Sequence, residues 1–167
     1  MKAMKPDYIT SAIEFFSKVL QLYECMGSEK NSKNKFAKSF NTRARSGPQL
    51  IKDLGVIPYI TFLASKSGED LMVKAYGILT SSSNICEGVD ENIRKSAEKM
   101  GYAVYAIAIL DYLVKLGVIN INKYSTIDVV RMLNDNLRKY RVVEPIIMNY
   151  LNELRKLSTA YFKEEQE

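Results

Sequence analysis

The chain has 167 residues, of which 47% are hydrophobic and 26% are charged, and its formal net charge is +5. This length and composition are typical of one globular domain with a core of its own, and they exclude a chain that is disordered over most of its length. Histidine is absent, which removes the commonest general base and the commonest metal ligand of proteins.

No segment has the pattern of a membrane span or of a secretion signal. The longest apolar stretch runs from Tyr102 to Leu110, whereas a helix needs about 20 apolar residues to cross a bilayer. Residues 1–7 contain no apolar signal core. We therefore expect a soluble protein of the cytoplasm.

The two cysteines, Cys25 and Cys86, stand in unrelated contexts, and neither belongs to a Cys-x-x-Cys motif. Two cysteines do not make a disulfide framework, and the usual zinc sites need more cysteine than this. We expect both to be small, buried, hydrophobic side chains.

The first predicted elements are two helices separated by a loop. Apolar residues at i, i+3 and i+4 predict a helix over 8–26 with Asp7 as its N-cap, and the polar stretch 27–34 is expected to be a loop. The basic segment 33–54 follows. Its Gly47-Pro48 step predicts a kink or a restart of the helix, and Gly55 is expected to end it in a left-handed conformation.

Two shorter helices come next. Pro58 opens a helix that reaches Lys66, and Ser67-Gly68 forms a turn. Glu69 and Asp70 place negative charge at the start of the following helix, where the helix dipole favours it. This helix weakens over 80–84, because serine and asparagine compete for backbone hydrogen bonds.

The remaining segments complete the predicted fold. The stretch 97–116 is apolar on most faces and belongs at the centre of a bundle. A capping box over 125–128 begins the next helix, and Pro145 stands near the start of the last one. The charged tail 163–167 is expected to fray. Since no segment has the pattern of a strand, we predict an all-α fold, a compact bundle of six or seven helices in a single domain over 1–167.

Motifs that carry catalysis are missing from the sequence. It has no Walker loop, no Gly-x-Gly-x-x-Gly, no Gly-x-Ser-x-Gly and no His-Glu-x-x-His. Glu87 and Asp90 flank Gly88, but two carboxylates give too few oxygens for a calcium site. We therefore expect no catalytic residue, no metal site, no cofactor and no enzymatic activity.

Positive charge is concentrated in one segment. Residues 30–52 hold seven basic residues and no acid, so the rest of the chain has a net charge of −2. On a helical wheel Phe36 and Phe40 mark the buried side, and Arg43 flanks it together with Lys33. The opposite side is expected to present three cations and two amides: Lys35, Lys38, Arg45, Asn34 and Asn41.

A lysine-rich helix face is often only solvated surface, but two features favour a binding role here. The segment lacks the acids that pair with lysine on ordinary helix surfaces. It also contains arginine, whose fork of donors suits phosphate. We interpret the segment as a surface that binds a phosphodiester backbone without reading its sequence.

Tyrosine is abundant, with eleven residues, of which Tyr102, Tyr105 and Tyr112 lie on the most apolar segment. Packing in the core and at its rim explains tyrosines at this spacing. Stacking of one of them on a nucleic-acid base is the alternative.

The stretch 41–66 reads NTRARSGPQLIKDLGVIPYITFLASK. It resembles the small subunit of the Cmr complex, the type III-B CRISPR RNA-silencing effector. The likeness covers about a sixth of the chain, and the residues after Gly88 resemble the family only in being helical. One departure is the valine after Gly55, where the family has leucine. The matching residues are Arg43, Ala44, Arg45, Pro48, Ile51, Gly55, Thr61-Phe62-Leu63 and Ser65-Lys66.

The resemblance implies a structural subunit without a nuclease site. Several copies would stack beside the subunits that hold the guide RNA and would line the channel for the target RNA. The implied partners are the guide RNA–target RNA duplex, other Cmr subunits and further copies of this chain, with no membrane and no small-molecule substrate. The residues that we expect to contact RNA are Lys35, Lys38, Arg43, Arg45, Lys52 and Lys66.

Three other interpretations stay open. The equivalent small subunit of a type III-A complex has a similar composition. A helical adaptor could use the basic face to bind an acidic protein. An enzyme with a carboxylate or cation site would need a convergent cluster of acids, which the sequence does not show.

Overall fold

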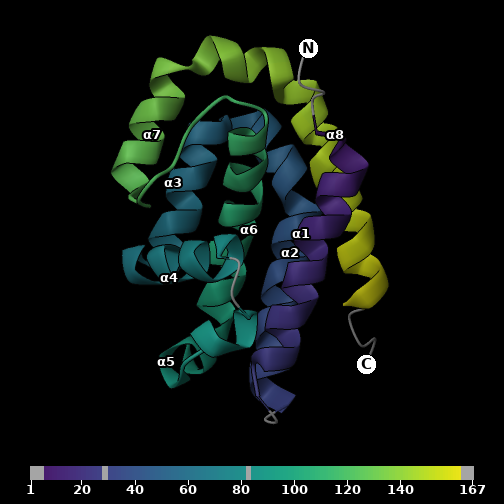
Figure 1. Ribbon diagram of the computed structural model, residues 1–167. Helices are drawn as coiled ribbons and strands as arrows, with labels where there is room; N and C mark the ends of the chain where they lie inside the picture. The colour runs from purple at the N-terminus through teal and green to yellow at the C-terminus, as the bar shows by residue number, and fades with distance from the viewer. Residues whose placement is uncertain (1–5, 28–29, 82–83, 163–167) are drawn as a thin grey trace.

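Figure 1 shows the computed structural model of the chain, which describes residues 6–27, 30–81 and 84–162. These residues form eight α-helices and one 3₁₀ helix and include no strand, which confirms the predicted all-α bundle. The predicted fraying tail lies outside the described residues. The elements are α1 (Tyr8–Cys25), α2 (Lys30–Leu54), α3 (Val56–Ser67), α4 (Glu69–Thr80), η1 (Ile85–Gly88), α5 (Glu91–Lys95), α6 (Ala97–Lys115), α7 (Thr126–Asp135) and α8 (Leu137–Tyr161).

Helix α6 is the centre of the bundle, as its apolar sequence predicts. Every residue from Ala103 to Leu110 is buried, and this requires neighbours around the whole circumference of the helix. Helix α2 packs along one side of α6, and α3 and α4 pack along another. Helices α1 and α8 lie side by side and close the bundle next to α2, while α7 bridges α3 and the start of α8 (Figure 1).

The helix ends follow local rules that the sequence makes visible. The Asp7 carboxylate accepts a hydrogen bond from the Thr10 amide at 3.1 Å, so Asp7 is the N-cap of α1 as predicted. Gly55 has φ +92°, and its amide donates to the Ile51 carbonyl at 2.8 Å. A residue with a side chain would be strained in this conformation, so glycine ends α2 as predicted.

Two predictions at prolines need correction. Helix α2 continues through Gly47-Pro48, so the predicted restart does not occur, and Pro145 stands well inside α8 rather than near its start. A proline in a helix interior costs about 3 kcal/mol, because it removes one hydrogen bond and clashes with the preceding turn. The burial of α2 against α6 and α8 overcomes this local preference, since both flanking turns carry core residues.

Helices α2 and α6 approach each other closely at two glycines. A Cβ atom on Gly101 would overlap the Ser39 side chain and would lie 2.8 Å from the backbone nitrogen of Phe40. A Cβ atom on Gly47 would overlap the ring of Tyr105. The Ser39 hydroxyl donates to the Glu98 carbonyl at 2.6 Å across the same contact. These glycines therefore fix how near the basic helix α2 lies to the core.

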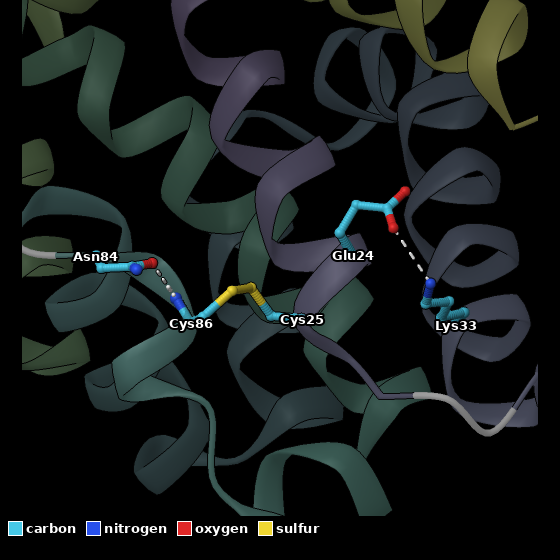
Figure 2. The surroundings of a disulfide bond; sticks show 5 residues. All are labelled: Glu24, Cys25, Lys33, Asn84 and Cys86. Atoms are coloured by element: carbon cyan, nitrogen blue, oxygen red, sulfur yellow. Dashed lines mark hydrogen bonds and ion pairs between the residues drawn. A yellow bond between two sulfur atoms is a disulfide. The ribbon is translucent and has the colours of Figure 1, made fainter.

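The prediction of two free, buried cysteines is wrong. Cys25 at the end of α1 and Cys86 in η1 form a disulfide with their Cα atoms 5.2 Å apart (Figure 2). Cys25 is buried, but Cys86 is exposed. The Asn84 side chain accepts a hydrogen bond from the Cys86 amide at 3.0 Å, which shapes the turn that carries the second sulfur (Figure 2). The cysteines are 61 positions apart in the sequence, so local sequence patterns cannot predict this pairing.

Two smaller predictions also need correction. The predicted loop over 27–34 is shorter, because α2 already begins at Lys30. Ser125 is the N-cap of α7, but its side chain makes no capping hydrogen bond. Instead, the Thr126 amide donates to the Glu69 carboxylate of α4 at 3.0 Å, so a tertiary contact supplies the cap.

Candidate nucleic-acid interface

The candidate interface begins with the outer face of α2, which we define as Lys35, Lys38, Arg45 and Lys52. All four side chains are exposed, on the side of the helix away from Phe36 and Phe40, as the wheel predicts. Lys38, Arg45 and Lys52 follow one another at intervals of seven residues, which places them on one stripe of the helix. The stripe spans about 21 Å along the helix axis.

Helix α8 adds two cations that the sequence analysis did not identify. A groove of about 660 Å³ lies between α2 and α8, and the residues that line it are all of polar or charged types. Arg45 therefore shares one groove with Arg155 and Lys156, although more than 100 residues separate them in the chain. The groove is lined by Thr42, Arg45, Ser46, Arg155, Lys156 and Thr159.

A buried hydrogen bond holds the two helices in this register. The Ser158 hydroxyl of α8 donates to the side-chain oxygen of Asn41 at 2.8 Å, and both residues are buried. The prediction that Asn41 lies on the exposed face is therefore wrong, because α8 covers that flank of α2. Asn34 is exposed as predicted.

The lysines of the outer face have no acidic partner in the described part of the chain, whereas several other cations are paired. Lys33 pairs with Glu24 at 3.2 Å (Figure 2), and Lys156 pairs with Glu153 at 2.6 Å. Within the described ranges, no ion pair involves Lys35, Lys38 or Lys52. Their charge is thus available to an external anion, and no internal pair has to be broken to bind one.

Arg43 and Lys66, the other two predicted RNA contacts, lie on a different flank of the molecule. The Arg43 guanidinium lies over the ring of Tyr102, 4.2 Å from its centroid, and the Lys66 ammonium lies 5.8 Å from the centroid of Phe62. The two rings meet edge to face at 6.3 Å. The six predicted residues therefore form two groups, and Arg43 and Arg45 face different sides of α2.

The structure offers little that resembles an acid–base centre. In the part of the chain that the structure describes, no three His, Cys, Asp or Glu residues are placed to hold a metal ion. Asp90 caps α5, and the backbone N–H of Ile93 lowers the pKa of its carboxyl group. Burial raises the pKa of the Tyr59 and Tyr105 hydroxyls, so both stay neutral at ordinary pH. What the surface can do is attract and hold a polyanion.

None of the helices in the described ranges is both long enough and apolar enough to cross a membrane. No protein-family model, no curated protein and no solved structure matches the chain.

Proposed function

We propose that this chain is a non-catalytic cytoplasmic subunit that binds the phosphate backbone of RNA through the outer face of α2. The observation that carries the proposal is the row of exposed lysines Lys35, Lys38 and Lys52, for which the described ranges show no acidic partner. Arg45 lies on the same face, and Arg155 extends the positive charge across the α2–α8 groove. Cations in a row along one helix match the repeating charge of a nucleic-acid backbone. Phosphate contacts of this kind fix position and orientation without reading sequence.

We further propose that the assembly is a type III-B CRISPR effector, in which the chain is the small Cmr subunit. The support is the resemblance over 41–66, a stretch that covers the second half of α2, Gly55 and most of α3. An all-helical fold with a basic second helix suits a subunit that stacks in copies along a guide RNA–target RNA duplex.

The affinity of one isolated chain for RNA should be weak and salt-dependent. Each neutralised phosphate contributes about −0.7 to the slope of log K against log salt for single strands. Contacts from Lys38, Arg45 and Lys52 would give a slope of roughly −2. Stacked copies would multiply these contacts along one RNA and bind it more tightly than one chain does.

The test compares two double variants that change the net charge equally. Lys38→Glu/Lys52→Glu reverses the outer face of α2, and Lys123→Glu/Arg131→Glu reverses two exposed cations on and beside α7. Fluorescence anisotropy with a labelled 20-nucleotide RNA would measure affinity at several salt concentrations. We expect the first variant to bind at least about tenfold more weakly at low salt and to lose roughly 1.4 units of slope, with the second variant close to the parent protein.

An equal loss of affinity in the two variants would show that only overall charge attracts RNA. Unchanged RNA binding in the first variant would refute the proposed surface.

The adaptor interpretation makes a different prediction. If the face binds an acidic protein, affinity purification from the source cells should recover one stable protein without RNA, whereas an effector subunit should bring guide RNAs and other effector subunits.

A further inference from the structure

Two aromatic rings flanked by two cations lie on a different flank of the molecule from the outer face of α2, and the proposed function does not use these rings. The aromatic row consists of Arg43 of α2, Tyr102 of α6, and Phe62 and Lys66 of α3. A cation lies at each end, over the face of the nearest ring, and the two rings meet in the middle. Three helices thus build one small surface.

Phe62 is the exceptional member of the row. Its side chain is 37% exposed, although a ring of this size usually gains free energy by full burial. Tyr59 lies against its inner side, with centroids 6.2 Å apart and an angle of 24° between the ring planes, and Tyr59 is itself fully buried against Tyr105. The ring of Phe62 therefore packs on Tyr59 and stays partly exposed, with the Lys66 ammonium near its face.

The charges decide what kind of molecule fits this row. A protein partner that covered the rings would have to remove the Lys66 ammonium from water, and lysine is depleted in protein interfaces. A nucleic acid suits both the rings and the cations, because its bases stack on aromatic rings and its phosphates accept hydrogen bonds from arginine and lysine.

We propose that the aromatic row is a stacking platform for an unpaired base of RNA, with the base on Phe62 and its flanking phosphates on Arg43 and Lys66. This inference rests on the proposed RNA-binding function and extends it. It identifies the ligand as a strand with at least one base out of the duplex stack, which the outer face of α2 does not require.

A tryptophan reporter tests the contact directly. The chain contains no tryptophan, so Phe62→Trp places a single indole at the platform and keeps an aromatic ring there. Ile127→Trp places one on α7 at a side chain that is 67% exposed. Each variant would be titrated at low salt with a 12-nucleotide oligouridylate, which carries bases, and with inorganic polyphosphate, which carries charge alone. We expect the RNA to quench the indole at position 62, with polyphosphate and the Ile127→Trp control giving little change.

Affinity measurements separate stacking from apolar contact. We expect Phe62→Ala and Phe62→Leu to bind the oligouridylate roughly tenfold more weakly, since one stacked base contributes about that factor. Phe62→Tyr keeps a ring of similar size and should bind within about twofold of the parent protein.

The outcomes distinguish this inference from the proposed function. Anisotropy that shows RNA binding without quenching at position 62 would overturn the platform and leave the function in place, whereas no RNA binding at low salt would overturn both. Equal quenching by polyphosphate would refute stacking. A Phe62→Ala variant that keeps its RNA affinity but self-associates less in sedimentation would assign the row to a second copy of the chain instead.

Discussion

At the scale of single residues, the Cys25–Cys86 disulfide is the feature with the largest expected effect on stability. It joins the end of α1 to η1, a short segment between α4 and α5 that packs against α1. Cross-linking two points 61 residues apart reduces the entropy of the unfolded chain, because the unfolded chain can no longer separate them.

We expect Cys25→Ala/Cys86→Ala to lower the free energy of unfolding by about 4 kcal/mol, the loop-closure value for this separation. Urea unfolding of the variant and of the parent protein would measure the difference, each with and without dithiothreitol. Reductant should destabilise the parent and leave the variant unchanged. A parent protein whose urea midpoint does not respond to complete reduction would contradict the prediction.

The same bond bears on where the protein works. Disulfides are rare in cytosolic proteins, with the intracellular proteins of hyperthermophiles as the main exception. The proposed cytoplasmic location and the Cys25–Cys86 bond are therefore compatible in a cell of that kind. Protein taken from its source under thiol-blocking conditions shows directly which redox state is present.

At the scale of the helix, Pro145 inside α8 is a local defect that packing tolerates. Proline has no backbone N–H, so the Arg141 carbonyl receives no helical hydrogen bond from position 145. The proline ring also crowds the preceding turn. Pro145 is exposed, so its ring gains little from burial. Pro58 offers a matched comparison, because it is also exposed but lies in the first turn of α3, where a helix needs no N–H.

We expect Pro145→Ala to raise the free energy of unfolding by about 1 to 3 kcal/mol, because alanine restores a hydrogen bond and favours helix. Pro58→Ala should change it by less than about 1 kcal/mol, and downward, since it only makes the unfolded chain more flexible. Urea unfolding of both variants tests this. Destabilisation by Pro145→Ala would mean that the packing of α8 on α1 and α2 requires a bend at this position.

At the scale of the whole molecule, the titratable groups predict a broad stability plateau. The sequence contains no histidine, and the cysteines are in a disulfide, so no side chain has an ordinary pKa between 5 and 8. Below this range, the pKa of the Asp7 carboxyl is lowered by the backbone N–H of Thr10. Above it, burial raises the pKa of the Tyr105 and Tyr150 hydroxyls.

We expect the free energy of unfolding to be nearly constant from about pH 5 to pH 9. Asp7 stabilises the fold above its ordinary pKa of 3.8, and this contribution is lost as the pH falls through the lowered value. The tyrosines stabilise the fold below their ordinary pKa of 10.0, and stability falls as the pH rises past it, because only the unfolded chain ionises them readily.

Urea midpoints at a series of pH values would measure this profile. Tyr150→Phe serves as the control, since it removes one buried hydroxyl and should reduce the alkaline loss. Tyr150 also donates to the Ala108 carbonyl at 2.9 Å, so the variant starts from a lower plateau. A steep change between pH 6 and pH 8 would contradict the prediction.

Local sequence determined much of this protein. The helical periods gave the all-α class and the central position of α6, because a buried face repeats every three to four residues whatever lies opposite. Asp7 and Gly55 mark helix ends through bonds to residues three or four positions away. The exposure of Lys35, Lys38, Arg45 and Lys52 follows in the same way, since it depends only on which side of α2 is apolar.

Only the tertiary structure decided which distant residues meet. It pairs Cys25 with Cys86, buries Asn41 against Ser158, brings Arg155 beside Arg45, and sets Arg43 on Tyr102. It also keeps α2 helical through Pro48 against the local preference for a break. Each of these outcomes depends on how neighbouring helices pack, and no pattern within one helix encodes the register of another.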